Sequence, residues 1–533
     1  MRPARSAIEA ALAANDIAHA AALAETALAA GEATPMLLNL AAWAREEAGD
    51  FAGAHRYLEQ ALTLSPRDPL IIAAIGSALR KQGLLADALA ALDQAIAIEP
   101  MLPSAWLDRG YALEASGSIA LAEHSFARSA AIDPSNTPAW GALADAAARQ
   151  GRRDVAHDAC ERALAIDAEE PRAMMALARL SIEEGALESA IARLGTLLDQ
   201  AALPPVDRFI ALSLMGDAHD RAGTPEAAFD RYTQANRLFE TIHAADIAAI
   251  DERQADFVAR VDAEVAGISP DGFRPLAPYA GGRAAIHAFL LGFPRSGTTL
   301  VENILASLPG AAAIEEQPTL EAADEAFLAK IGGLEWLAYI DDPQPFQRAY
   351  WGRVAAAGVA LEKTQLFVDM DPLKGIRLPI IARLFPGAKV IVMRRDPREV
   401  VWSCFRTAFA PSGSAIEFTS LMRTAQLYDA TIRLTERCLA TMEIDAHILR
   451  YDRLVEDFDA TTQSLCGFLG VDWTEDMRAF DKTATARGVS TASIGQVRRG
   501  LYDGRRQWEP YAARIDEVMP VLMPWVEKFG FER

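Results

Sequence analysis

Residues Leu291–Thr299 read LGFPRSGTT, and this stretch decides how the C-terminal half of the chain folds. It follows the apolar run AIHAFLL at 285–291, which is typical of a buried parallel strand, and it precedes the apolar-periodic segment LVENILASL. The spacing Gly292-x4-Gly297 matches the start of a Walker A loop, in which backbone N–H groups and a helix N-terminus surround phosphate oxygens. The sequence therefore predicts a strand, a phosphate-binding loop and a helix.

The end of this loop differs from that of a nucleotide triphosphatase. Thr298 stands where those enzymes have lysine, Thr299 follows it, and Arg295 and Ser296 enter the loop. We therefore expect the anion to be bound without the usual lysine and magnesium arrangement.

The N-terminal half repeats with a period of 34 residues. Glycines recur at this step at positions 49, 83, 117, 151 and 185, and prolines recur at 66, 100 and 134. One unit carries Trp106, Gly110, Ala122, Phe126, Ser129 and Pro134 at spacings that resemble the tetratricopeptide repeat. Each unit is predicted to be a helical hairpin whose small residues let two helices approach closely. Because Gly223 extends the pattern, the array is expected to cover residues 1–243.

A repeat solenoid exposes a concave groove, and the resemblance implies that this groove binds a peptide or a protein partner. The array could instead be a spacer or a dimerisation element, and the sequence leaves a homodimer open. Most of the net charge of -21 falls in residues 1–265. An acidic groove would favour a basic peptide, but acidic residues are also ordinary on a solvated surface.

The bulk composition excludes several classes of protein. The negative net charge argues against nonspecific nucleic-acid binding, which requires a basic surface. No run reaches the ~18 apolar residues of a membrane span. The four cysteines lack metal-site or disulfide-framework spacing, which favours a reducing compartment. We expect a cytoplasmic, multidomain protein: repeats over 1–243, a helical linker and connector over 244–283, and an α/β domain over 284–533.

The segment PRSGTTL after a strand resembles the 5′-phosphosulfate loop of sulfotransferases. Residues ~284–530 resemble that family, and in particular its tyrosylprotein sulfotransferase-like group, some of whose bacterial members carry tetratricopeptide repeats. The resemblance implies a P-loop-like domain with a central parallel sheet and 3′-phosphoadenosine 5′-phosphosulfate (PAPS) as the donor, without a metal. It assigns donor binding in the loop to Pro294, Arg295, Ser296, Gly297, Thr298 and Thr299, and it makes Arg295 a catalytic residue that neutralises charge during the transfer.

Two catalytic residues beyond the loop come from the same resemblance. Glu316 is expected to be the general base that accepts the proton of the acceptor hydroxyl, with Glu315 as the alternative. The run Val359–Lys363 is interpreted as a strand ending in a lysine, and Lys363 as the cation that stabilises the leaving phosphate oxygen. Family members usually continue as K-x-P-x-N, whereas this chain reads KTQLF at 363–367.

The remaining donor contacts are expected further along the chain. Arg395 follows a predicted strand, and Ser403 lies eight residues later, as in the family's 3′-phosphate motif. Tyr451 matches a tyrosine near the adenine, although a packed core tyrosine is the alternative. The segment TASIGQVRR at 491–499 resembles one that closes over the nucleotide, and it supplies Ser493, Gln496, Arg498 and Arg499 as contacts.

These expectations describe a PAPS-dependent sulfotransferase that acts on an acceptor hydroxyl. The resemblance favours a protein tyrosine, held by the repeat groove, but glycans, lipids and small molecules stay open. Two alternatives are a repeat scaffold whose catalytic domain is weakened and a degenerate P-loop kinase. The missing Walker lysine and the Arg395 and Ser403 pair argue against the kinase.

Overall fold

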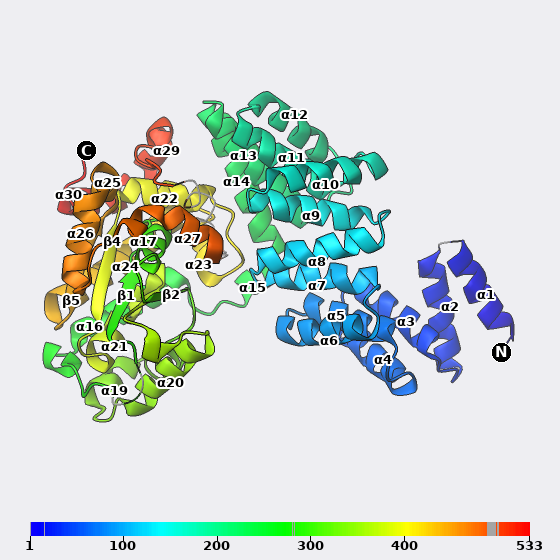
Figure 1. Ribbon diagram of the computed structural model, residues 1–533, viewed down its shortest axis with the longest axis horizontal. Coiled ribbons are helices and arrows are strands. Elements are labelled where there is room, and N and C mark those ends of the chain that lie inside the picture. The colour runs from blue at the N-terminus through cyan, green and yellow to red at the C-terminus, as the bar shows by residue number, and fades with distance from the viewer. Residues whose placement is uncertain are drawn as a thin grey trace. The chain divides into compact units, whose positions relative to one another are not determined.

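The computed structural model describes residues 2–14, 16–279, 281, 283–487, 497 and 500–532. The chain forms two compact units, Met1–Gln200 and Ala201–Arg533. Figure 1 shows the helices and strands of each unit.

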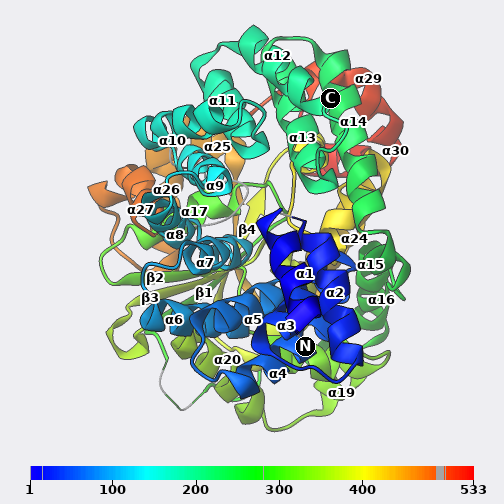
Figure 2. The ribbon, with the colours of Figure 1, turned by 90° about the vertical axis from the view of Figure 1, so that its right-hand side faces the viewer.

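The first unit consists of helices that stack as consecutive antiparallel pairs (Figures 1 and 2). They are α1 (Arg2–Ala13), α2 (Ile17–Ala29), α3 (Pro35–Glu47), α4 (Phe51–Leu64), α5 (Pro69–Lys81), α6 (Leu85–Ile98), α7 (Pro103–Ala115), α8 (Ile119–Ile132), α9 (Thr137–Arg149), α10 (Arg153–Ile166), α11 (Pro171–Glu184) and α12 (Leu187–Leu198). The predicted repeat of helical hairpins is confirmed.

The periodic glycines end the first helix of each pair. They all take a left-handed conformation, with φ from 74° at Gly151 to 81° at Gly185. This conformation is strained for residues with a Cβ atom, so glycine is favoured directly after a helix. The 34-residue step of the glycines is therefore the step of the helical hairpin.

Small residues let the two helices of a hairpin touch. A Cβ atom added at Gly110 would lie 2.3 Å from the Phe126 ring, and one added at Gly76 would lie 2.5 Å from Leu92. These pairs are one period apart. The close approach of helices at small residues, predicted from the sequence, is confirmed.

The second unit begins with another hairpin, α13 (Pro205–Arg221) and α14 (Pro225–Ile242). Its interior follows the same rule, because a Cβ atom at Gly216 would lie 2.5 Å from the Tyr232 ring. This hairpin therefore shares the packing of the repeats but lies in the same compact unit as the α/β domain.

A five-stranded sheet forms the centre of the second unit, with strand order β2-β3-β1-β4-β5 and only parallel pairs. Its strands are β1 (Ile286–Leu291), β2 (Ala311–Glu315), β3 (Leu366–Met370), β4 (Lys389–Arg394) and β5 (Asp445–Arg450). The predicted α/β domain with a parallel sheet is confirmed. The strands β2 and β3 lie on one side of β1, and β4 and β5 lie on its other side. Ligands of such sheets bind beyond the carboxyl ends of the strands, at the point where the chain changes from one side to the other.

Helices cover both faces of the sheet. The further described helices of this unit are α15 (Ala244–Ala248), α16 (Gln254–Gly267), α17 (Thr298–Ala306), α18 (Glu321–Phe327), α19 (Gly333–Tyr339), α20 (Gln344–Ala356), α21 (Leu378–Leu384), α22 (Pro397–Arg406), α23 (Gly413–Glu417), α24 (Leu421–Thr441), α25 (Tyr451–Glu456), α26 (Phe458–Leu469), α27 (Phe480–Arg487), α29 (Ala512–Ile515) and α30 (Met519–Lys528). Short 3₁₀ helices are η1 (Pro270–Phe273), η2 (Leu361–Lys363), η3 (Pro372–Arg377), η4 (Glu475–Ala479), η5 (Glu509–Tyr511) and η6 (Asp516–Val518).

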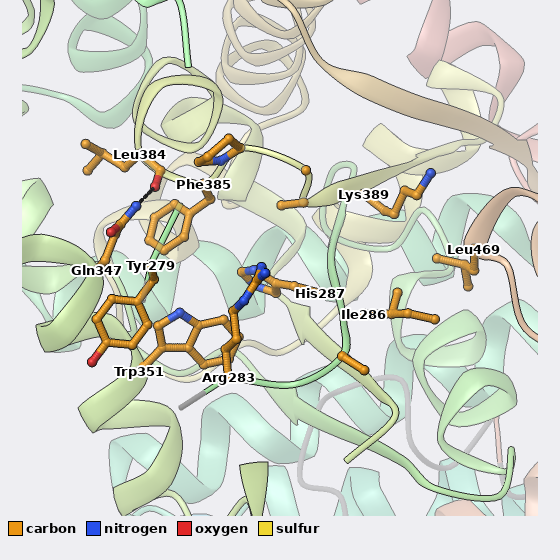
Figure 3. A pocket seen from close by; sticks show the side chains of 14 residues that line it. Tyr279, Arg283, Ile286, His287, Gln347, Trp351, Leu384, Phe385, Lys389 and Leu469 are labelled. Atoms are coloured by element: carbon orange, nitrogen blue, oxygen red, sulfur yellow. Dashed lines mark hydrogen bonds between the residues drawn. The ribbon is translucent and has the colours of Figure 1, made fainter. Parts of the chain in front are cut away.

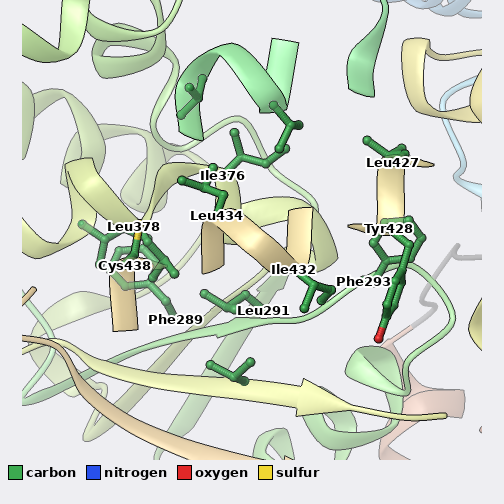
Figure 4. Packing of buried hydrophobic residues seen from close by; sticks show 14 of the residues in the cluster. Phe289, Leu291, Phe293, Ile376, Leu378, Leu427, Tyr428, Ile432, Leu434 and Cys438 are labelled. Carbon is green, nitrogen blue, oxygen red and sulfur yellow. The ribbon is translucent and has the colours of Figure 1, made fainter. Parts of the chain in front are cut away.

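The residues of β1 alternate between two hydrophobic cores. Phe289 and Leu291 belong to a core that includes residues of α24 such as Leu434 (Figure 4). Ala288 and Leu290 belong to a second core that includes residues of α17, α26 and α27. Because both faces are covered, the strand is apolar almost throughout, as its sequence predicts.

Among the described residues, the helices are too short or too polar to cross a lipid bilayer.

Candidate functional site

The loop of residues 292–297 lies between β1 and α17, as predicted. Gly297 precedes α17 with φ 107°, and a Cβ atom there would lie 3.0 Å from the Tyr451 ring. Thr298 and Thr299 are buried in the first turn of the helix. The N–H groups of a first helical turn have no partner within the helix, so this position favours a bound anion.

The loop is fixed to its surroundings by short contacts. A Cβ atom at Gly292 would lie 2.7 Å from Ser296 Oγ and 3.0 Å from the carbonyl oxygen of Met393 at β4. The Cys404 thiol lies 3.4 Å from the carbonyl oxygen of Pro294, to which it donates. Glycine at 292 therefore lets the loop lie close against β4.

Three residues that are predicted to bind the sulfuryl donor meet at the carboxyl edge of β1 and β4. Arg295 Nε donates to Ser403 Oγ on α22 over 3.0 Å. Arg395, directly after β4, donates through NH1 to the carbonyl oxygen of Arg295 over 2.8 Å. Sequence positions 295, 395 and 403 thus form one cluster, which the loop alone did not define.

This cluster is rich in positive charge. Burial lowers the pKa of Arg295 to about 10, and the positive charges of Arg406 and Arg395 act in the same direction. The group still carries its charge at neutral pH. Arg395 Nε is buried without a hydrogen-bond partner among the described atoms, and the nearest carboxylate, that of Glu399, lies 3.6 Å from Arg395 NH2. A bound anion would compensate these charges.

Tyr451 is part of the same cluster. The guanidinium of Arg395 lies over its ring, 4.6 Å from the centroid. The Tyr451 hydroxyl donates to the carbonyl oxygen of Tyr502 over 2.7 Å and accepts from the N–H of Gly504 over 3.2 Å. Tyr451 therefore links Arg395 and the loop to the C-terminal part of the chain.

Glu315 and Glu316 lie at the carboxyl end of β2, beside the first turn of α17. Glu315 accepts from Thr299 Oγ1 over 3.4 Å. Glu316 has φ 49°, which is uncommon for a residue with a side chain, and its N–H donates to the carbonyl oxygen of Met370 over 2.7 Å. This left-handed backbone conformation directly follows the last residue of β2, Glu315.

The environment of Glu316 favours its protonated form. The side chain reaches solvent, but the surrounding chain displaces enough water to raise the pKa of Glu316 to about 7, and the carboxylates of Asp371 and Glu302 add repulsion. A carboxyl group that titrates near neutral pH is suited to proton transfer.

The expectation for Lys363 is wrong. Residues 359–363 form no strand; Lys363 ends η2, and the strand β3 begins at Leu366. Since β1 and β3 are parallel with Ile286 opposite Leu366, Lys363 lies at the amino edge of the sheet, away from the loop. The apolar run Leu366–Val368 was the better strand signal, and it continues through a buried Asp369 that obscured it.

A pocket of about 200 Å³ also lies at the amino edge (Figure 3). It is lined by side chains that include Tyr279, Arg283, His287, Trp351 and Lys389. None of the 14 described residues that line it is a predicted donor ligand. The pocket and the phosphate loop are therefore separate features at opposite ends of β1.

Comparison with known proteins agrees with this geometry. Residues 288–475 match the model of the sulfotransferase family, and residues 46–107 and 147–212 match that of the tetratricopeptide repeat. In sequence order, the chain carries a tetratricopeptide-repeat array followed by a sulfotransferase-family domain. The match begins within β1 and covers the loop, Glu315, Glu316, Arg395, Ser403 and Tyr451.

Two curated relatives are similar to this chain. An uncharacterized protein of Aquifex aeolicus is 27% identical in an alignment of 361 residues that covers 64% of this chain and 45% of the relative. The nodulation protein NoeE of Sinorhizobium fredii is 28% identical in an alignment of 214 residues that covers 34% of this chain and 50% of the relative. The chain thus spans about half the length of the curated relatives it matches.

Solved structures similar to the chain are repeat proteins. The tetratricopeptide-repeat protein TTC0263 of Thermus thermophilus is 22% identical, with 34% of this chain and 98% of that chain covered and a TM-score of 0.30. YrrB, a repeat protein described as having an unusual peptide-binding site, is 16% identical, with 36% and 97% covered and a TM-score of 0.28.

Four predicted contacts, Ser493, Gln496, Arg498 and Arg499, lie outside the residues that the structure describes. Their place in the sulfotransferase-family domain stays a prediction. The described chain resumes at Gly500, close to Tyr502 and Gly504, whose backbone contacts Tyr451.

Sequence reasoning missed two acidic residues of the site. Asp371 follows β3, and Glu302 lies fully buried on α17, where Arg487 donates to its Oε1 over 2.7 Å. Placing the strand at 366–370 would have shown that Asp371 and Glu316 end neighbouring strands. No sequence pattern indicated a role for Glu302, because the apolar spacing of α17 does not depend on which residue stands at this position. Among the described residues, no group of His, Cys, Asp or Glu is arranged to bind a metal ion.

Proposed function

We propose that the second unit transfers a sulfuryl group from PAPS to an acceptor hydroxyl. The observation that carries this proposal is the cluster of Arg295, Ser403 and Arg395 beside the first turn of α17. This cluster contains backbone N–H groups, two guanidinium groups and a hydroxyl. Together they can donate hydrogen bonds to two separate anionic groups. The sulfotransferase-family match covers all these residues.

The residues fit a nucleotide with phosphates at both ends of the ribose. The loop 292–297 and the N-terminus of α17 would hold the 5′-phosphosulfate, and Arg395 with Ser403 would hold the 3′-phosphate. Arg395 Nε is buried without a hydrogen-bond partner among the described atoms, which is costly unless a ligand accepts from it. The donor supplies an activated sulfuryl group.

Glu316 is proposed as the base that accepts the proton of the acceptor hydroxyl. Its raised pKa near 7 lets it hold and release a proton at physiological pH. Glu315 is the alternative, but it already accepts from Thr299. The proposal therefore assigns proton transfer to Glu316 and support of the helix turn to Glu315.

Charge on the leaving phosphate oxygen would be stabilised by Arg295 and by the N-terminus of α17. Both lie at the loop, whereas Lys363 lies at the other edge of the sheet. Preorganised donors in a site that excludes water act strongly on such charge. No step of this proposal requires a metal ion.

The acceptor is proposed to be a tyrosine of a protein or peptide held with the help of the repeat array. The support is the presence of the repeats, since arrays of this kind expose a groove suited to peptides. Transfer to a glycan, a lipid or a small molecule instead of a tyrosine would contradict this part of the proposal.

The test is ligand binding to the full chain by calorimetry. Adenosine 3′,5′-bisphosphate should bind without magnesium, and adenosine 5′-phosphate should bind more weakly because it lacks the 3′-phosphate. Tight binding of magnesium-ATP with no affinity for the bisphosphate would instead favour a kinase. If the bisphosphate binds but labelled PAPS transfers nothing to a host lysate, the chain would be a scaffold that retains the nucleotide site.

A further inference from the structure

The repeat-like hairpin α13 and α14 packs on α22, the helix that carries Ser403. Tyr232 and Trp402 make an edge contact with ring centroids 5.9 Å apart, and Phe229 stacks on Phe405 at 5.3 Å. Asn236 donates to the carbonyl oxygen of Phe405 over 3.0 Å. In a repeat array the next repeat would cover this hairpin, so here α22 takes the place of that neighbour.

Asp220, near the C-terminal end of α13, connects the hairpin to two segments of the domain. It accepts from Arg406 NH1 on α22 over 2.8 Å and from the Tyr511 hydroxyl over 2.5 Å. Tyr511 also stacks on Trp402 with centroids 3.7 Å apart. One carboxylate thus fixes both the end of α22 and the chain that follows residue 500.

Arg406 extends this connection to the donor site. Its NH2 donates to Gln507 Oε1 over 2.5 Å, and Gln507 in turn donates to the Tyr502 hydroxyl. We call residues 501–508 the covering segment. Its backbone accepts from Arg395 at Gly504 over 2.5 Å and from Tyr451 at Tyr502 over 2.7 Å. The covering segment is therefore held by Arg406 on one side and by donor-site residues on the other.

Both ends of the Arg406 guanidinium are occupied by protein groups. Asp220 neutralises its charge, and Gln507 fixes its orientation. This arrangement favours a structural role of Arg406 over a direct role in phosphate binding, for which a free guanidinium edge would be needed. Arg406 therefore connects the hairpin to the covering segment. We call the connected side chains of Asp220, Arg406 and Gln507 the tie.

We propose that Asp220 is a positioning residue for donor binding, which acts through Arg406 and Gln507 to hold the covering segment against Arg395 and Tyr451. The hairpin that resembles a repeat is then a working part of the catalytic unit. This inference deepens the proposed function and rests on it for the identity of the ligand.

The experiment uses the full chain with Asp220→Asn, which keeps the shape of the side chain and removes its charge. The dissociation rate of adenosine 3′,5′-bisphosphate should rise about tenfold, as expected for loss of a charge-assisted hydrogen bond. Backbone hydrogen exchange without ligand should rise in residues 501–508. The matched control is Glu226→Gln, which removes an exposed ion pair between the same hairpin and Arg514 at 3.2 Å. It should change neither quantity.

A second variant separates positioning from general loss of stability. Gln507→Ala removes the other end of the tie at a partly exposed position. It should raise the dissociation rate similarly, and the double variant should be no worse than either single variant, because all three break one connection. Additive effects, or unchanged exchange in 501–508 with Asp220→Asn, would overturn the proposal.

The two proposals fail in different ways. If the wild-type chain does not bind the bisphosphate, the proposed function is wrong, whereas the exchange measurement without ligand still tests the tie. If the wild-type chain binds and Asp220→Asn binds equally well with the same dissociation rate, the role of Asp220 is wrong and the donor site stands.

Discussion

The two edges of the parallel sheet differ in the charge of the buried polar groups that they leave unpaired. Inside the sheet and toward its amino edge, His287 shares a hydrogen bond of 2.7 Å with Tyr350, whose hydroxyl donates to Asp369 over 3.0 Å. At the carboxyl edge, the charged groups Arg395 and Glu302 bury Nε and Oε2 without hydrogen-bond partners among the described atoms, whereas Gln347 Oε1, the unpaired atom beside the amino-edge pocket, belongs to a neutral amide. Burying such groups unpaired costs free energy, so a fold retains them where a ligand completes them.

The two regions also differ in the pKa values of their titratable side chains. Burial, with Lys374 nearby, lowers the pKa of His287 to about 3, so this ring is neutral throughout the physiological range. Glu316 instead has a pKa of about 7 and changes charge within that range. The buried and paired His287 supports the fold, whereas Glu316 and Glu399, whose pKa values burial raises to about 7, lie at the edge where chemistry is proposed.

The largest effect is expected from Glu316→Gln. Loss of a general base should lower kcat by roughly 100-fold to 10,000-fold, because the acceptor hydroxyl then loses its proton to water. Affinity for adenosine 3′,5′-bisphosphate should stay unchanged. Steady-state kinetics and calorimetry measure the two quantities. Glu315→Gln is the matched control, and a larger loss in that variant would transfer the role of base to Glu315.

Removal of Arg395 should give the next largest effect. Arg395→Ala loses charge-assisted hydrogen bonds worth roughly 1.5–3 kcal/mol, so affinity for the bisphosphate should fall about 10-fold to 100-fold. Adenosine 5′-phosphate should be affected much less, since it lacks the 3′-phosphate. Equal losses for both ligands would mean that Arg395 does not face the 3′-phosphate.

The activity should depend on pH through Glu316. A base acts when deprotonated, so kcat/KM should rise about tenfold per pH unit below a pKa of about 7 and level off above it. Stability has the opposite sign, because a raised carboxyl pKa means that ionisation above the unfolded pKa opposes folding. Glu316→Gln should therefore lose the rising limb of activity and melt no lower than wild type at pH 8. A rising limb that persists in this variant would assign it to another group.

The smallest effect is expected from Lys363→Ala at the amino edge. Lys363 is exposed and lies beyond the strand end opposite the loop, so affinity and kcat should change less than about twofold, as for other surface substitutions. It is also the charge-matched control for Arg395→Ala. A loss as large as that of Arg395→Ala would place Lys363 in the site and contradict the difference between the two edges.

Local patterns in the sequence were sufficient for much of the fold. The 34-residue step follows from the length of one helical hairpin, and the glycines follow from the left-handed turn after its first helix. The strand, loop and helix around Leu291–Thr299 formed as predicted because their signals are contiguous. The strand at 366–370 was missed because a buried Asp369 interrupts its apolar run.

The sequence by itself determined the repeat array, the parallel α/β domain and the phosphate loop, since each depends on residues that are near one another in the chain. Tertiary structure alone decided that Arg295, Arg395 and Ser403 form one cluster, that Lys363 is remote from it, and that α13 connects to the covering segment through Asp220. These contacts join residues about 100 positions or more apart. Their register depends on strand order and helix packing, which no short stretch of sequence encodes.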